Sequence, residues 1–331
     1  MKVLYPFWIC LLFIFTEMSL HAQQSDTGKE KVIRFDDTRK FNWGPDYKEV
    51  EIISSVDQKI QKAFFHKAQS PNKRPLVVSL HTWGGDYSQR DSLAELCRIN
   101  DVNYIHPDFR GPNKTKEACG SDLVISDIND AIDYAIANSN VDTTRITIIG
   151  VSGGGYVTLC CFMKLKRNIY RYSAWASITD LEAWYNQSKI RGNKYDLNVL
   201  ECTCSESTLD IDNARQRSPY YMQTPISKIG NTELYIYAGV YDGIQGSVPI
   251  THSINFYNKL LSDIGEKDPS KYVSDTEKLH LLEFRTPISE TGQIGSRKIC
   301  LQKEVKQIRF TVFEGNHEML TQYAFDEIMK E

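Results

Sequence analysis

Residues 148–159, IIGVSGGGYVTL, place one serine among glycines, between apolar β-branched residues and helix-forming ones. This order predicts a strand, a tight turn and a helix, with Ser152 at the turn. The glycines let the backbone turn sharply and leave the hydroxyl uncrowded. The helix that follows would direct unpaired N–H groups and a partial positive charge at the same place. Either a reactive serine or a purely structural turn would fit this stretch.

Strands and helices alternate along the rest of the chain. Apolar runs that end in glycine or polar residues predict buried strands, and SDLVISDINDAIDYAIANS (121–139) has clear helical spacing. Residues 47–68 predict two antiparallel strands. The alternation predicts an α/β fold, a mostly parallel sheet with helices on both faces, in one domain over 49–331. Segments 180–218 and 262–305 are expected as insertions that cover or rim the carboxyl ends of the strands.

Composition and the N-terminus limit the function. The 331 residues are 41% hydrophobic and 24% charged, with a net charge of −3, so the concentrated basic face that nucleic acid requires is not expected. Residues 1–22 have a lysine, an apolar run and a small-residue exit, which predict a secretory signal peptide cleaved after Ala22. A polar segment, 23–48, follows. We therefore expect a periplasmic or secreted protein without a stable membrane span after cleavage.

The cysteines give no sign of a metal. Seven cysteines remain after the expected cleavage, and an odd number leaves at least one thiol free, with the pairing open. Cys202 and Cys204 are too close together for common zinc sites. We expect neither a metal nor a cofactor.

Residues far from Ser152 supply what a serine nucleophile needs. Gly150, Ser152 and Gly154 fit the G-x-S-x-G nucleophile elbow, in which an acid and then a histidine follow on later strand ends. Asp242 lies near the end of the predicted strand segment TELYIYAGVYDG (232–243), just past its buried part, and His317 follows the predicted final strand QIRFTVFEG (307–315). Because a serine hydroxyl is a weak nucleophile without a base oriented by an acid, we predict a catalytic triad of these three side chains.

An oxyanion site should lie beside the serine. The backbone N–H of Gly153, directly after the nucleophile, is one expected donor. The second is expected from the loop after the first central strand, where HTWGG (81–85) offers the N–H of Trp83. We expect His81 to be a structural hydrogen-bonding residue rather than a second base.

Several motifs resemble those of α/β-hydrolases, and more narrowly the catalytic domain of the prolyl oligopeptidase group. They are HTWGG, PDFRG, SDINDAIDYA, residues 142–155, RSPYYM, VYDG and VPITHS. Peptidases of that group carry a β-propeller before this domain. Here about fifty residues separate the predicted signal peptide from the hydrolase core, and this is too few for a propeller. The chain also resembles secreted Bacteroidetes carbohydrate esterases of the pectin methylesterase type. That resemblance implies hydrolysis of methyl esters of galacturonate through an acyl-enzyme at Ser152.

The expected partner is therefore an ester of a plant polysaccharide or oligosaccharide. Trp83 and Trp184 could stack on sugar faces, and Arg110 could bind a uronate carboxylate, with Lys114 and Lys116 as further candidates. Arg110 could equally be a structural ion-pair partner. An acetyl or feruloyl esterase and a small serine peptidase are alternatives, because an activated serine attacks either kind of carbonyl. A non-catalytic glycan-binding scaffold is disfavoured, because candidates for all three triad positions are present.

Overall fold

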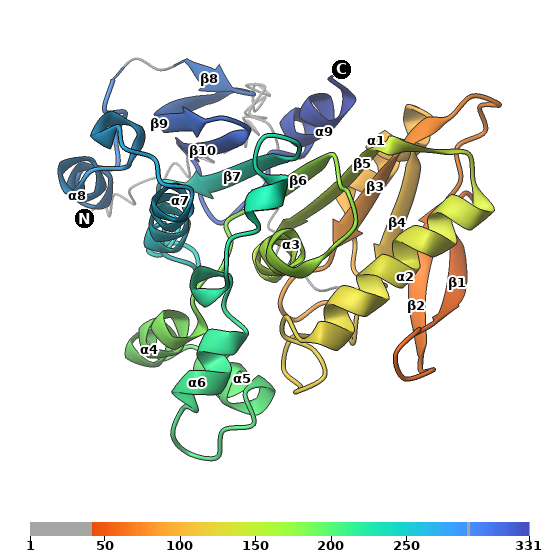
Figure 1. The fold of residues 1–331 in the computed structure, drawn as a ribbon, viewed down its shortest axis with the longest axis horizontal. Helices are drawn as coiled ribbons and strands as arrows, with labels where there is room; N and C mark the ends of the chain where they lie inside the picture. The colour runs from red at the N-terminus through yellow and green to blue at the C-terminus, as the bar shows by residue number, and fades with distance from the viewer. Residues whose placement is uncertain (1–41, 290–291, 331) are drawn as a thin grey trace, which may run out of the picture. The chain divides into compact units, whose positions relative to one another are not determined.

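The strand that ends at Ser152 lies inside a large twisted sheet (Figure 1). The computed structural model describes residues 42–289 and 292–330. Its strands form one sheet in the order β1-β2-β4-β3-β5-β6-β7-β10-β9-β8. The strands are β1 (Lys48–Ile53), β2 (Ile60–His66), β3 (Arg74–Leu80), β4 (Asn103–Pro107), β5 (Val141–Val151), β6 (Arg171–Trp175), β7 (Glu233–Gly239), β8 (Gln293–Ile294), β9 (Arg297–Val305) and β10 (Ile308–Phe313).

The centre of the sheet is parallel and its edges are antiparallel. Strands β4, β3, β5, β6, β7 and β10 pair in parallel, whereas β1 pairs antiparallel with β2, β2 with β4 and β9 with β10. The predicted mostly parallel sheet and the predicted antiparallel pair near the start are both confirmed. Because parallel strands share a direction, the loops after β3, β5, β7 and β10 emerge at the same edge.

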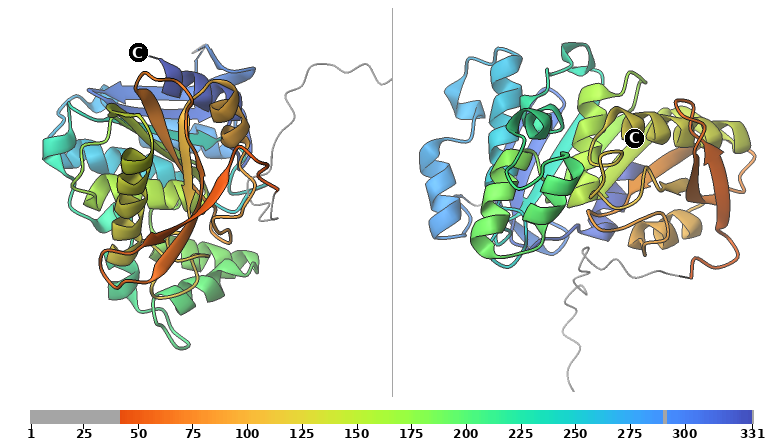
Figure 2. Two further views of the ribbon diagram at one scale, coloured as in Figure 1. Left: turned by 90° about the vertical axis from the view of Figure 1, so that its right-hand side faces the viewer. Right: turned by 90° about the horizontal axis from the view of Figure 1, so that it is seen from below.

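Helices cover both faces of the sheet, as the sequence predicts. Alternate strand residues point to opposite faces, so Ile148 lies in one apolar cluster and Ile149 in the other. The first cluster contains side chains of α2 (Asp122–Asn138), α3 (Gly153–Lys164) and α7 (Thr251–Asp263). The second contains side chains of α1 (Ser92–Ile99) and α9 (Thr321–Met329). Figure 2 shows these layers from two further directions.

Three short helices lie beyond one end of the strands (Figure 1). They are α4 (Leu181–Arg191), α5 (Tyr195–Cys202) and α6 (Ile211–Gln216), and we call them the helical cap. They correspond to the predicted insertion 180–218, whose helical conformation the sequence did not indicate. Short 3₁₀ turns, η1 (Pro219–Tyr221) and η2 (Ile226–Lys228), lead the chain back to β7.

The second predicted insertion, 262–305, is placed differently from our expectation. It contains η3 (Pro269–Lys271), α8 (Asp275–Glu283), β8 and β9. β9 is a full strand of the main sheet, hydrogen-bonded to β10 from Ile299 to Val305. The expectation that this segment covers or rims the site therefore does not hold for β9, because this strand satisfies its backbone groups in the main sheet.

Other predictions concern the N-terminus and the cysteines. The predicted signal peptide and most of the polar segment 23–48 lie outside the described residues. Within residues 42–289 and 292–330, no helix combines the length and apolar character that a bilayer crossing requires. All seven cysteines of these residues carry free thiols, and Cys204 is the exposed one.

Candidate active site

Ser152 occupies a strained corner between β5 and α3. Its backbone angles are φ 58° and ψ −119°, a conformation that non-glycine residues rarely adopt and that costs roughly 1–3 kcal/mol. Its N–H donates to the carbonyl of Trp175 at 2.9 Å, which fixes the corner against β6. A Cβ on Gly150 would lie 2.4 Å from the carbonyl carbon of Gly154, so the strand and the helix approach too closely for larger residues. The elbow glycines are therefore required by backbone contact.

The two expected oxyanion donors are neighbours. A Cβ on Gly153 would lie 2.2 Å from the backbone nitrogen of Trp83, so these two peptide groups lie against each other beside Ser152. Ser152, Trp83 and Gly84 also line one cavity. Two N–H groups at such a place can stabilise the negative charge that develops on a carbonyl oxygen under attack.

The loop that carries Trp83 is held from several directions. The carbonyl of Trp83 accepts from the N–H of Asn113 at 2.8 Å, and the N–H of Thr82 donates to the side chain of Gln89 at 3.0 Å. The ring of His81 stacks on Phe109, with 3.8 Å between ring centroids. The structural role predicted for His81 agrees with this contact, whereas Asn113 and Gln89 could not be predicted because neither belongs to a motif.

Asp242 and His317 meet in a buried hydrogen bond. Nδ1 of His317 donates to Oδ2 of Asp242 at 2.7 Å, and the side chains are 6% and 1% exposed. The other carboxylate oxygen, Oδ1, accepts from the N–H groups of Gly243 and Val248 at 2.8 and 3.1 Å. These contacts orient the carboxylate, which in turn orients the imidazole.

The loops after β7 and β10 bring this pair together. A Cβ on Gly239, the last residue of β7, would lie 2.0 Å from the carbonyl oxygen of Asn316. The N–H of Tyr241 donates to the carbonyl of Gly315 at 2.9 Å. The acid and the histidine thus emerge at the same edge of the sheet as Ser152, the position that the order of the motifs predicts.

Two other histidines are unsuitable as bases. Burial lowers the pKa of His106 to about 4, mainly by desolvation of its charged form. Desolvation, together with the charge of Arg191, lowers the pKa of His252 to about 3. Both side chains are almost fully buried, away from the surface of the cavity at Ser152.

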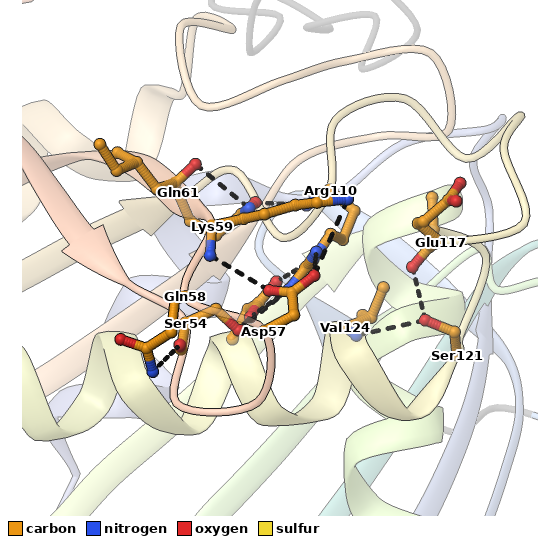
Figure 3. A network of polar contacts seen from close by, with 12 residues as sticks. Ser54, Asp57, Gln58, Lys59, Gln61, Arg110, Glu117, Ser121 and Val124 are labelled. Atoms are coloured by element: carbon orange, nitrogen blue, oxygen red, sulfur yellow. Dashed lines mark hydrogen bonds and ion pairs between the residues drawn. The ribbon is translucent and has the colours of Figure 1, made fainter.

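The prediction that Arg110 contacts substrate is wrong. Figure 3 shows its guanidinium enclosed by the turn after β1 and by α2. It donates to both oxygens of Asp57 (2.7 and 3.0 Å), to Ser54 Oγ (2.9 Å) and to both oxygens of Asp127, and its side chain is 4% exposed. The structural ion-pair alternative is the one that the structure supports.

The prediction that Trp184 stacks on substrate is also wrong, because its side chain is fully buried. Its ring lies 4.6 Å from that of Trp83 and 4.9 Å from that of Tyr195, and Nε1 donates to the carbonyl of Ser247 at 3.0 Å. Trp184 therefore connects the helical cap to the loop after Asp242. Trp83 does line the cavity, so its contact with substrate stays a prediction.

Gly246 is a site residue that the sequence analysis missed. A Cβ there would lie 2.2 Å from Oδ1 of Asp242 and 2.5 Å from Cβ of His317. Its position, four residues after Asp242 in the sequence DGIQGS, was the available signal.

We predict that Gly246→Ala lowers kcat/KM for a small aryl ester about 100-fold, because a displacement of about 1 Å of catalytic groups has that size of effect. Ser247→Ala, in the same loop, is the matched control and should stay within about two-fold, because the Ser247 contact to Trp184 uses the backbone carbonyl. Steady-state kinetics and thermal melting of both variants check this. Equal kinetics for the two variants would contradict the role given to Gly246.

Together, the sheet and the corner at Ser152 define an α/β-hydrolase fold. A family model described as the prolyl oligopeptidase family matches residues 101–291, and the chain belongs to that family.

Solved structures share the fold at low sequence identity. Pyrococcus horikoshii acylaminoacyl peptidase is 16% identical, with a TM-score of 0.58 over 89% of this chain and 41% of its own. A Mycobacterium tuberculosis puromycin-hydrolyzing peptidase is 12% identical, with a TM-score of 0.56 over 85% of this chain and 38% of its own. Prolyl oligopeptidase B from Galerina marginata has a TM-score of 0.52 at 14% identity, over 66% of this chain and 32% of its own. The chain thus spans about two-fifths of the length of the first two.

Proposed function

We propose that the protein is a serine hydrolase that cleaves peptide-like acyl bonds through an acyl-enzyme at Ser152. The observation that carries the proposal is the oriented Asp242–His317 pair at the same sheet edge as the strained serine corner. A buried acid that fixes a histidine has a clear use beside a serine whose hydroxyl must lose a proton.

Each group has one role in the proposed reaction. Ser152 Oγ attacks the substrate carbonyl carbon while His317 accepts the hydroxyl proton, and Asp242 stabilises the imidazolium that results. The N–H groups of Gly153 and Trp83 donate to the tetrahedral oxyanion. Collapse breaks the acyl bond, and His317 returns the proton to the departing amine or alcohol. Water then repeats the sequence on the acyl-enzyme and releases the acid.

The family relationship and the similar structures favour peptides as substrates. The family is named for an oligopeptidase, and the similar structures named above are peptidases. These comparisons do not support the pectin methylesterase activity that the resemblance in sequence implied.

Methyl esters of pectic galacturonate remain the second candidate, on one observation. Lys114 and Lys194 line the cavity at Ser152, where cations would suit a uronate chain. A plant polysaccharide partner belongs to this second candidate, whereas a periplasmic or secreted location rests on the predicted signal peptide of residues 1–22, and both remain proposals.

Labelling and a substrate panel test the proposed function. A fluorophosphonate probe should add to the wild-type protein, and the mass increase should disappear in Ser152→Ala but persist in Ser188→Ala, which removes another buried serine. The labelled enzyme should cleave acylated peptide anilides in preference to methylated pectin, acetylated xylan and feruloyl esters. Methanol release from pectin alone would replace the peptidase proposal with the second candidate. Unchanged labelling of Ser152→Ala would overturn both.

A further inference from the structure

The cavity beside Ser152 has a volume of about 270 Å³ and lies between the catalytic loops and the helical cap. Its walls come from four segments: the loop after β3, the loop between β4 and α2, the corner at Ser152 and the start of α5. The lining residues are Thr82, Trp83, Gly84, Pro112, Lys114, Ser152, Lys194, Tyr195 and Asn198.

The lining places the cavity on the acyl side of the scissile bond. His317 must return a proton to the leaving group, so the leaving group departs on the side of that imidazole. Neither His317 nor Asp242 lines the cavity, whereas Ser152 and Trp83 do. The part of the substrate that stays attached to Ser152 would therefore occupy it.

The cavity is cationic although the chain as a whole is slightly acidic. Two lysines and no aspartate or glutamate are among the lining residues, in a chain of net charge −3. Lys114 and Lys194 are both exposed, and neither makes an ion pair within residues 42–289 and 292–330. The acid closest to Lys194 in sequence, Asp196, belongs to the first turn of α5 but does not line the cavity.

Two other cations of the same part of the chain already lie beside carboxylates. Arg110 is enclosed by Asp57 and Asp127, and the amine of Lys116 lies 4.0 Å from Glu117. Lys114 and Lys194 thus differ from Arg110 and Lys116 in having no carboxylate partner in the described chain, and they differ from Arg191, which donates to backbone carbonyls of the loop after Asp242. Two cations from separate segments that converge on one hollow attract a negative charge there.

We propose that this cavity selects substrates whose acyl part carries a carboxylate, which Lys114 and Lys194 bind. This inference rests on the proposed serine hydrolase function and adds the charge of the substrate to it. The carboxylate could belong to an acidic amino acid or to a uronate, and the chemistry of recognition is the same for both.

Boronic acids test the proposal for either kind of acyl bond, because boron accepts the electron pair of Ser152 Oγ and becomes tetrahedral while His317 takes the hydroxyl proton. The probes are 3-carboxyphenylboronic acid and its uncharged analogue 3-carbamoylphenylboronic acid, as inhibitors of 4-nitrophenyl acetate hydrolysis by the full chain. We expect the carboxylate to inhibit about ten-fold more tightly at low salt and the preference to shrink as salt is added.

Lysine variants identify the cause. The measured quantity is the ratio of the inhibition constants of the two boronic acids. This ratio should fall to about one in Lys114→Met/Lys194→Met and should invert in Lys114→Glu/Lys194→Glu. In the control, Lys116→Met, it should stay at the wild-type value. Thermal melting establishes that each variant is folded. A wild-type ratio near one, or an unchanged ratio in the double methionine variant, would overturn the proposal.

Further results distinguish a failure of the carboxylate proposal from a failure of the proposed hydrolase function, and they identify the molecule that carries the carboxylate. If a folded wild-type protein neither hydrolyses the ester nor binds either boronic acid, the proposed function itself fails. Faster hydrolysis of N-acetylglutamyl 4-nitroanilide than of N-acetylglutaminyl 4-nitroanilide would identify an acidic amino acid as the source of the carboxylate. A preference for partly over fully methylated oligogalacturonide would identify a uronate.

Discussion

Replacing Asp242 with asparagine is expected to lower kcat/KM for a small aryl ester about 10⁴-fold while the protein stays folded. The reason lies in how the carboxylate is held. Oδ1 accepts two backbone N–H groups, from Gly243 and Val248, and Oδ2 accepts from His317. An asparagine would keep its carbonyl oxygen at the two N–H groups, so its NH₂ group would face the imidazole.

An NH₂ group at that position reverses the hydrogen bond to the histidine. Nδ1 of His317 would have to accept, which leaves the proton of the neutral ring on Nε2. A ring in that form cannot take the proton of the Ser152 hydroxyl, although the geometry of the site is preserved. The loss should therefore appear in kcat with little change in thermal stability.

Asp180→Asn is the matched control for this variant. Asp180 also follows a central strand, and its carboxylate caps α4 by accepting from the N–H of Ala183 at 3.0 Å. An asparagine can accept the same bond, so we expect kcat/KM within about three-fold of the wild type. Steady-state kinetics and melting curves decide the matter: if Asp242→Asn retains more than a tenth of the wild-type rate, the Asp242–His317 pair does not have the proposed role.

The sequence revealed the corner at Ser152 because its causes are local. A strand, a glycine turn and a helix occupy twelve consecutive residues, and the glycines are required by contacts such as that between Gly150 and Gly154. Asp242 and His317 could be predicted as candidates because the fold places the acid and the histidine after particular strands. That they contact each other is an observation of the structure, and their catalytic roles stay predictions.

The errors have a common physical cause. The sequence shows that Arg110 and Trp184 are able to bind a carboxylate or a sugar, but it does not show which groups of the protein already contact them. Arg110 meets a partner 53 positions away, and Trp184 donates to a carbonyl 63 positions away. Burial and pairing of this kind depend on the tertiary fold.

Arg110→Met is expected to lower the free energy of unfolding by about 3–5 kcal/mol, the largest stability effect that we predict. The carboxylate of Asp127 is 1% exposed and would lose its cationic partner, so that among the described residues it would retain only the hydroxyl of Ser54 at 2.6 Å. Leaving one buried charge unpaired lowers the free energy of unfolding strongly. Removing both charges of the pair lowers it much less, because the desolvation cost of both groups is removed as well. Arg110→Met/Asp127→Asn should therefore be more stable than Arg110→Met alone.

Arg98→Met is the control that separates burial from charge. Arg98 also pairs with two carboxylates, of Glu95 at 2.7 Å and Asp46 at 3.5 Å, but its side chain is 37% exposed. Exposed pairs contribute little, so this variant should lose less than about 1 kcal/mol in urea unfolding experiments. If Arg110→Met proved no more costly than Arg98→Met, the network in Figure 3 would not hold the loop from β4 to α2 in place. That loop also carries Lys114, so the same variant should weaken the preference for a carboxylate that we propose for the cavity.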